Sequence, residues 1–157
     1  MSERLLNDWL QGRASLAAAS EWTTEEMRLV ADLGYALAEQ GREQEALTIF
    51  EGLSALAPAT AYFQAALGAL RLRLGEPQLA IGHLDAALAS DPQNISALVN
   101  RGEACLQLGE YAAATRDLEA ALRLGETFPS EDETLRLARA RALLFRLRTL
   151  AGGTAGA

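Results

Sequence analysis

The stretch GYALAEQG (34–41) decides the fold, because its pattern returns as GALRLRLG (68–75) and as GEACLQLG (102–109). Each stretch begins and ends with glycine, and successive stretches start 34 residues apart. A fixed period of this length is the sequence signature of a helical repeat protein. The chain therefore aligns, without gaps, as three repeats over residues 27–60, 61–94 and 95–128.

The two glycines of each stretch have different predicted roles. The first lies inside a helical pattern, where glycine costs about 1 kcal/mol relative to alanine, so we expect a neighbouring helix to approach closely there. The second follows the last apolar residue of the pattern, where a left-handed residue that ends a helix is easiest for glycine. Pro77 suits the first turn of the next helix, and Pro58 and Pro92 are placed to stop one. Each repeat is thus predicted to be a helix, a short turn and a second helix.

Composition favours an all-α protein of one domain. Its 157 residues are enough to bury a core without disulfides or metal, and only 6% of them are aromatic. Lysine is absent, and 14 arginines against 21 carboxylates give a formal charge of −7. Because phosphate binding needs a surplus of cations, we expect no nucleic-acid partner and no anionic membrane surface.

The sequence gives little support for catalysis or for a cofactor. The single cysteine, Cys105, and the single histidine, His83, cannot supply the three or four ligands of a usual zinc site. The glycine pairs belong to the repeat rather than to a strand-to-helix phosphate loop. We therefore expect no enzyme activity, no metal and no cofactor.

The sequence also bears on location. The N-terminal residues MSERLLNDWLQGR (1–13) do not form a secretory signal pattern. No window approaches the roughly 20 apolar residues that cross a bilayer. We expect a cytoplasmic protein without membrane insertion, and the use of arginine in place of lysine points to a bacterial source.

Both flanks of the repeats are predicted to be helical. Leu5, Leu6, Trp9 and Leu10 lie on an apolar stripe of residues 2–18. Thr23 with Glu26 is the pattern of a capping box that opens the first repeat. The predicted segments are an N-terminal helix and linker (1–22), three repeats (23–128), a C-terminal capping helix (129–151) and a disordered tail (152–157).

The C-terminal helix is predicted over residues 131–150. Gly125 is expected to close the last repeat helix, and Ser130 with Glu133 to form a second capping box. The apolar face of this helix is assigned to Leu135, Ala138, Ala142 and Phe145. Its five arginines leave two interpretations open, an amphipathic cap on the stack or a basic docking surface for an acidic partner.

The repeat resembles the tetratricopeptide repeat, a 34-residue helical hairpin. The matching columns, besides the glycines, are Ala46, Ala80, Ala114 and Phe50, Leu84, Leu118. Gln64, Arg71 and Arg101 depart from the pattern, since apolar or aromatic residues are usual at those positions. The resemblance implies a superhelical stack of three hairpins whose first helices line a concave groove for a peptide or helix of a protein partner.

The resemblance also implies which residues line that groove. They are Arg28, Tyr35, Glu39, Tyr62, Ala65, Ala69, Leu72, Arg73, Val99, Asn100, Glu103 and Leu106. Adaptors that grip a chaperone's C-terminal carboxylate use lysines, asparagines and arginine here, and only Asn100 is kept at those places. The predicted groove is lined mainly by small apolar residues and two tyrosines, which suits a segment with apolar side chains.

A narrower resemblance comes from LGYALAEQGREQEALTIFEGL (33–53), AYFQAALGALRLRLGEPQLAI (61–81) and GEACLQLGEYAAA (102–114). These strings are similar to class II chaperones of type III secretion, which hold hydrophobic translocators in the bacterial cytoplasm. That family would imply homodimerisation through Leu5, Leu6, Trp9 and Leu10. Two alternatives stay open, a scaffold or adaptor without chaperone activity and, more remotely, an RNA-associated protein using the arginine-rich helix 134–148.

Overall fold

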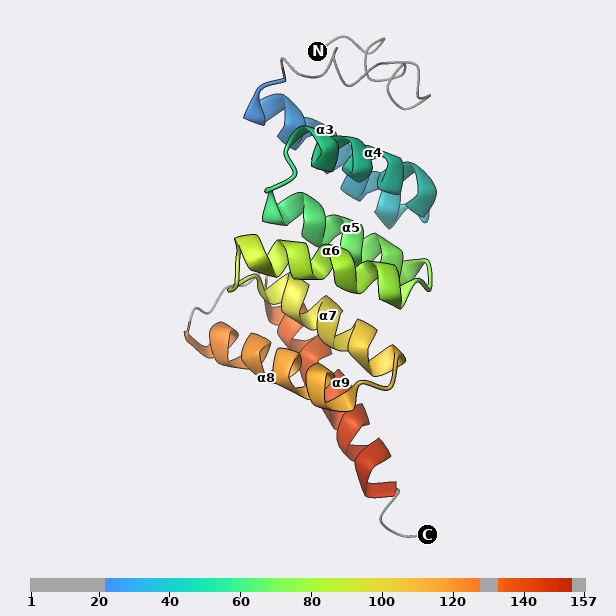
Figure 1. Ribbon diagram of the computed structural model, residues 1–157, viewed down its shortest axis with the longest axis vertical. Coiled ribbons are helices and arrows are strands. Elements are labelled where there is room, and N and C mark those ends of the chain that lie inside the picture. The colour runs from blue at the N-terminus through green and yellow to red at the C-terminus, as the bar shows by residue number, and fades with distance from the viewer. Residues whose placement is uncertain (1–21, 128–132, 154–157) are drawn as a thin grey trace.

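The computed structural model describes residues 22–127 and 133–153. These residues form helices and no strand, which confirms the predicted all-α class. Figure 1 shows the helices in chain order. They are α3 (Thr24–Glu39), α4 (Glu43–Leu56), α5 (Ala61–Arg73), α6 (Pro77–Ser90), α7 (Ile95–Gln107), α8 (Tyr111–Thr127) and α9 (Thr134–Gly153).

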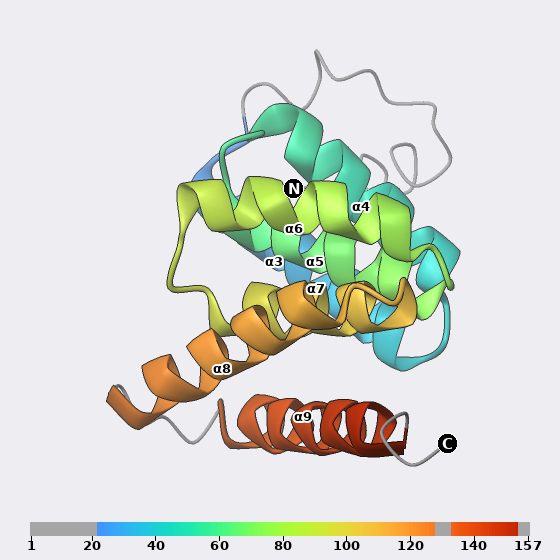
Figure 2. The ribbon, with the colours of Figure 1, turned by 60° about the horizontal axis from the view of Figure 1, so that its bottom comes forward.

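The helices pair into three antiparallel hairpins that stack on one another. Helix α3 packs on α4, α5 on α6 and α7 on α8, and each hairpin contacts the next. In Figure 1 the stack runs from α3 to α8, and α9 lies behind α7 and α8. Seen from below in Figure 2, α9 lies beside α7 and α8 as the last layer. The architecture is the predicted superhelical stack of helical hairpins.

The glycine columns have the two roles that the sequence predicted. A Cβ atom on Gly34 would lie 2.7 Å from Phe50 Cε2, and one on Gly102 would lie 2.7 Å from Leu118 Cγ. The first glycine of each repeat therefore faces the large residue of its partner helix. Gly41, Gly75 and Gly109 have φ values of 76°, 75° and 78°, so each ends a first helix in the left-handed region.

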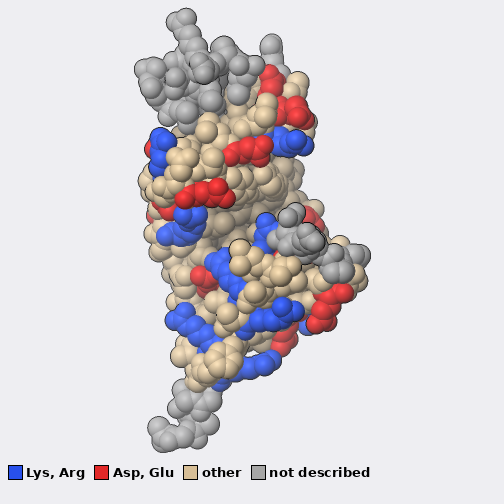
Figure 3. Space-filling model, turned by 180° about the vertical axis from the view of Figure 1, so that it is seen from behind, with Lys and Arg blue, Asp and Glu red and all other residues tan. Residues whose placement is uncertain are grey.

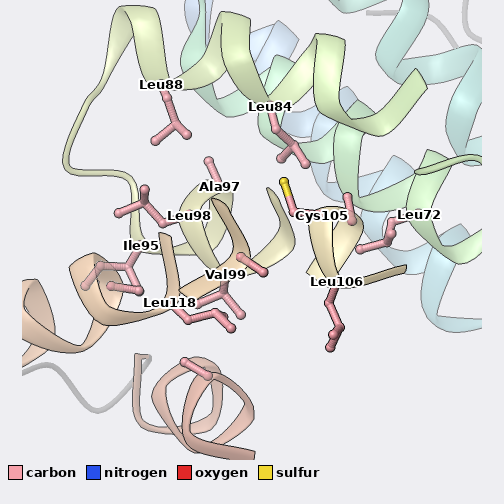
Figure 4. Close-up of a cluster of buried hydrophobic side chains, with 14 of the residues drawn as sticks. Leu72, Leu84, Leu88, Ile95, Ala97, Leu98, Val99, Cys105, Leu106 and Leu118 are labelled. Atoms are coloured by element: carbon pink, nitrogen blue, oxygen red, sulfur yellow. The ribbon is translucent and has the colours of Figure 1, made fainter. Parts of the chain in front are cut away.

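The hydrophobic core extends along the stack in two clusters that meet at α5. Phe63 and Leu67 of α5 join the first cluster, with Phe50. Ala65 and Leu72 of α5 join the second cluster, which continues to α9. Figure 4 shows part of the second cluster, with Leu84 and Leu88 of α6 directed toward α7. A core of this kind is built from contacts between neighbouring repeats.

Two of the three departures from the repeat pattern form polar bridges around α5. Gln64 donates from Nε2 to Ser54 Oγ at 2.7 Å, and its Oε1 lies 3.0 Å from His83 Nδ1. Arg71 pairs with Glu51 at 2.8 Å and with Glu76 at 2.7 Å. These contacts explain polar residues where the repeat usually has apolar ones, because each side chain finds partners on adjacent segments.

The predicted capping box at the start of the first repeat helix is present. The Glu26 amide donates to Thr23 Oγ1 at 3.2 Å, and the Thr23 amide donates to Glu26 Oε2 at 2.9 Å. The Thr23 amide and hydroxyl both donate to the Glu26 carboxylate, and these two hydrogen bonds lower its pKa. The apolar stripe of the predicted N-terminal helix lies outside the described residues.

The C-terminal part corrects two expectations. Gly125 does not end the last repeat helix, because α8 continues to Thr127, and Gly125 is buried where Leu137 of α9 packs against it. The buried face of α9 is formed by Ala140, Leu144 and Leu147 rather than by the predicted stripe, of which Leu135 and Phe145 are 80% and 70% exposed. Both sets of residues have the spacing of a helix face. Ala140, Leu144 and Leu147 are the set that packs against α7 and α8.

The end of the chain departs from the expected boundaries in a smaller way. Helix α9 runs to Gly153, two residues into the predicted tail. Ser130 of the second expected capping box lies outside the described residues, so that capping box stays a prediction.

Candidate functional site

The face that carries the first helices contains a pocket of about 550 Å³. Its lining comes from α3, α5, the α6–α7 turn, the start of α7 and the start of α9. We call it the tyrosine pocket, and its lining residues are Tyr35, Tyr62, Ala65, Ala66, Ala69, Asp91, Gln93, Asn94, Ile95, Ser96, Glu133 and Arg136. Figure 3 shows the molecule from behind, the side on which α9 lies in front of the stack.

Two tyrosines form one wall of this pocket. The ring centroids of Tyr35 and Tyr62 are 5.6 Å apart, and the rings are tilted by 59°. Tyr35 also packs edge-on against the buried Phe50 at 5.1 Å, and Tyr62 against the buried Phe63 at 5.7 Å. The core therefore holds both rings in place, although 39% and 43% of their surfaces stay exposed.

The tyrosine hydroxyls stay neutral over a wide pH range. Partial burial raises the pKa of Tyr35 well above its usual value, and the neighbouring Tyr62 adds to the effect. Burial also raises the pKa of Tyr62. The wall thus offers aromatic surface and neutral hydroxyl groups, which is a suitable surface for an apolar segment with a hydrogen-bonding backbone.

Small side chains of α5 form the floor of the pocket. Ala65 and Ala66 are buried and Ala69 is half-buried, so the floor lies close to the helix backbone. The rim is polar: Asn94 accepts a hydrogen bond from the Ala97 amide at 2.9 Å, which fixes the start of α7 beside the pocket. Charges of both signs, from Asp91, Glu133 and Arg136, lie at the edge.

A second hollow of about 530 Å³ lies on the other side of Tyr62. Its lining includes Met27, Arg28 and Asp32 of α3 and Phe63 of α5. Tyr62 therefore separates two hollows and presents surface to both. Five of the residues predicted for the groove, Arg28, Tyr35, Tyr62, Ala65 and Ala69, line one or both of them.

Arg73, another predicted groove residue, connects the first two hairpins. Its Nη2 donates to the Ala38 carbonyl at 2.8 Å and to Glu43 Oε1 at 2.7 Å. The pKa of Glu43 is lowered, chiefly by a backbone hydrogen bond and then by Arg73. Glu39 is exposed at the end of α3, whereas Leu72 is buried in the core.

In the third repeat, α9 covers the residues predicted for the groove. Val99 and Leu106 are buried in the cluster that includes Leu144 and Leu147 of α9. Arg139 of α9 donates to Asn100 Oδ1 at 3.0 Å and pairs with Glu103. In this conformation the third repeat contacts the chain's own last helix, and the open surface belongs to the first two repeats.

The far wall of the tyrosine pocket does not follow from the repeat pattern. Asp91, Gln93 and Asn94 come from the turn before α7, Glu133 directly precedes α9, and Arg136 lies in its first turn. The repeat pattern carries no signal for them, because it predicts helix faces rather than the position of a turn or of the last helix.

The single cysteine, Cys105, lies beside Arg101, Glu110 and Asp117. Burial raises the pKa of the Cys105 thiol to about 11, so the thiol is protonated at neutral pH. Within these ranges no cluster of three or more acidic, histidine or cysteine side chains is placed to hold a metal ion. The helices of these ranges are also too short or too polar to span a membrane.

Comparison with known proteins identifies the repeat. Residues 95–126 match the tetratricopeptide repeat family. The chain is 34% identical over 113 residues to the protein FlbA of Caulobacter vibrioides, which covers 72% of this chain and 19% of FlbA. The chain spans about a fifth or less of the length of the curated relatives it matches.

Solved structures share the fold over most of the chain. A type III secretion system complex from Aeromonas hydrophila superposes with a TM-score of 0.76 at 29% identity, covering 96% of this chain and 99% of that one. The Yersinia enterocolitica type III secretion chaperone SycD, in complex with a peptide of the translocator YopD, superposes with a TM-score of 0.72 at 22% identity, covering 83% and 98%. The fold of this chain is therefore that of tetratricopeptide-repeat chaperones of type III secretion.

Proposed function

We propose that this tetratricopeptide-repeat chain binds an apolar segment of a client protein in the tyrosine pocket, as a cytoplasmic chaperone for hydrophobic type III secretion translocators. The observation that carries the proposal is the pair Tyr35 and Tyr62, held by the core above a floor of alanines and still about two fifths exposed. The fold shared with SycD, which was solved with a translocator peptide, supports the same role.

The chemistry of the pocket fits an extended or helical segment with apolar side chains. Aromatic residues that are already fixed lose little conformational freedom on binding, so they contribute more than mobile side chains of equal area. The alanine floor leaves depth for a client side chain, and the neutral hydroxyls and Asn94 offer hydrogen bonds to its backbone. Holding such a segment removes from water the surface through which a hydrophobic client would aggregate.

Self-association belongs to the same proposal. Leu5, Leu6, Trp9 and Leu10 are the candidates for a homodimer contact, and they lie outside the described residues. Removal of residues 1–20 is expected to leave a folded monomer if this segment only dimerises. If the stack unfolds instead, the segment acts as a cap and the dimer proposal is lost.

The test uses the YopD peptide as the probe. Calorimetric titration should show binding to the full chain, with the Tyr35→Ala and Tyr62→Ala double variant weaker by about tenfold or more. Leu79→Ala is the control, since Leu79 is 54% exposed on α6 and lines neither hollow. Unchanged affinity in the double variant would show that Tyr35 and Tyr62 do not contribute to peptide binding.

Co-expression separates a chaperone from a scaffold. A hydrophobic translocator should gain soluble yield when it is expressed with the wild-type chain and lose that gain with the double tyrosine variant. If the translocator stays insoluble, and a folded protein binds the same tyrosines, the chain is a scaffold or adaptor.

A further inference from the structure

The last helix, α9, is apolar on two opposite faces. Ala140, Leu144 and Leu147 are 0%, 6% and 6% exposed, because they pack on α7 and α8. On the opposite side, Leu135 and Phe145 are among the most exposed large hydrophobic residues, at 80% and 70%. A single cap on a helical stack needs only one apolar face, so the second one calls for a partner.

The exposed residues form one continuous stripe. Residues 135, 138, 142 and 145 follow the 3, 4, 3 spacing of a helix face, half a turn away from the buried residues 140, 144 and 147. We call this stripe, Leu135, Ala138, Ala142 and Phe145, the outer stripe. Its two large residues are separated by about 15 Å along the axis, at 1.5 Å per residue, with alanines between them.

Arginines border the outer stripe on both sides. By helix geometry, Arg141 and Arg148 follow one edge, and Arg139 and Arg146 follow the other. Arg139 is bound to Asn100 and Glu103. The other three form no ion pair with any residue that the structure describes. In Figure 3, blue side chains gather on the part of the surface formed by α9.

Helix α9 also lacks the neighbour that earlier helices have. Helices α3, α5 and α7 are each followed by a second helix that packs on them, whereas in the described part of the chain α9 contacts chiefly α7 and α8. A hollow of about 230 Å³ lies between α8 and α9, and no outer-stripe residue lines it. Its lining includes Tyr111, which is 51% exposed, with Leu144, Leu147 and Arg148.

We propose that the outer stripe binds an amphipathic helix of a partner protein whose apolar residues face the stripe and whose edges carry aspartate or glutamate. Alanines between Leu135 and Phe145 allow a partner helix to approach closely. The free arginines then pair with the acidic edges, as charges flanking an apolar seam do in coiled coils. None of the outer-stripe residues lines the tyrosine pocket, although Glu133 and Arg136 beside Leu135 do. The inference does not depend on the proposed client.

Charge and side-chain size favour this occupant over two others. A second copy of α9 would bring arginine edges against arginine edges, which is repulsive. Helices that bind membrane surfaces carry large apolar residues on the face between their cationic edges, whereas the middle of the outer stripe is alanine.

The test compares two labelled peptides by fluorescence anisotropy. The first has three heptads, about 21 residues, with leucine at the seam positions and glutamate at the flanking positions. The control peptide carries lysine in place of every glutamate. The wild-type chain should bind the acidic peptide, more weakly at high salt, and should not bind the basic one.

Variants assign the binding to the outer stripe. Leu135→Ala with Phe145→Ala should weaken binding by about tenfold or more. Arg141→Gln with Arg148→Gln should weaken it by about fivefold and reduce its salt dependence. Leu29→Ala is the matched control, because Leu29 is a large apolar residue that is 58% exposed on another helix, α3. All of these side chains are exposed, so the variants should keep the wild-type circular dichroism.

Three outcomes would overturn the proposal. The first is failure to bind the acidic peptide, or equal binding of both peptides. The second is binding to phosphatidylserine vesicles that outer-stripe variants abolish, while the peptide has no effect. The third is a loss of self-association in those variants on size-exclusion chromatography, which would make a second copy the occupant.

Discussion

Arg101 of α7 donates two hydrogen bonds to Asp117 of α8, from Nε to Oδ2 at 2.7 Å and from Nη2 to Oδ1 at 2.8 Å. Its third nitrogen reaches Asp85 of α6 at 2.7 Å. One side chain thus joins three successive helices at a position where the repeat usually has an apolar residue. Asp117 is only 8% exposed, so its carboxylate depends on this partner.

We expect Arg101→Ala to destabilise the fold. Breaking a fully buried pair costs about 3–5 kcal/mol, and here we expect about 2 kcal/mol because the Arg101 side chain is 26% exposed. Urea denaturation followed by circular dichroism measures the change. The double variant Arg101→Met with Asp117→Leu should recover most of the loss, since it leaves no unpaired buried charge. A double variant as unstable as the single one would contradict this account.

A second prediction concerns the interior glycines. Gly68→Ala should destabilise the chain by about 1–3 kcal/mol, because the new methyl group overlaps the Leu84 side chain across the hairpin. Gly82→Ala is the matched control within a helix, since a Cβ there meets nothing within 4 Å. That change should stabilise the chain by about 0.5–1 kcal/mol. Thermal unfolding of both variants measures these changes in stability. Equal changes in the two variants would contradict the predicted overlap with Leu84.

The glycine columns show how much of the fold the sequence could predict. The interior glycine of each repeat faces the residue of the Phe50, Leu84, Leu118 column in the same repeat. The repeated sequence pattern therefore predicts a repeated packing contact. The packing side of α9 could not be predicted in this way. Its two apolar stripes have equal helical spacing, and only contact with α7 and α8 distinguishes them.

The candidate site was predictable to the extent that it follows the repeat. Tyr35 and Tyr62 lie on first helices and were found from that geometry. Glu103 occupies the same repeat column as Tyr35, and Asn100 lies on the same helix as Glu103, yet Arg139 of α9 bonds to both. Whether a groove residue is open therefore depends on the docking of the last helix, which no repeat column encodes.

A third prediction follows from Cys105. Burial raises its thiol pKa from 9.0 to about 11, so the folded state disfavours the thiolate. The resulting stability is present in full below pH 9 and is lost as the pH rises to 11, because the unfolded chain deprotonates first. The loss should reach about 2 kcal/mol near pH 11. In urea denaturation, the free energy of unfolding of Cys105→Ala should fall less steeply between pH 9 and 11 than that of the wild type. An identical pH dependence would contradict the raised thiol pKa.

The last prediction concerns the contact that holds α9 over the third repeat. Arg139 is the side chain of α9 that bonds to both Asn100 and Glu103. Arg139→Gln should loosen α9 with little loss of global stability, because partly exposed ion pairs contribute about 0–1 kcal/mol. Hydrogen exchange should then increase in α9 and in residues 99–106 but not in α3 to α5, since local opening exposes only what the helix covers. Arg146→Gln is the control, as Arg146 forms no ion pair with a described residue. If both variants exchange like the wild type, apolar contacts of Leu144 and Leu147 alone hold α9 in place, and the third repeat stays closed to a client whatever happens at Arg139.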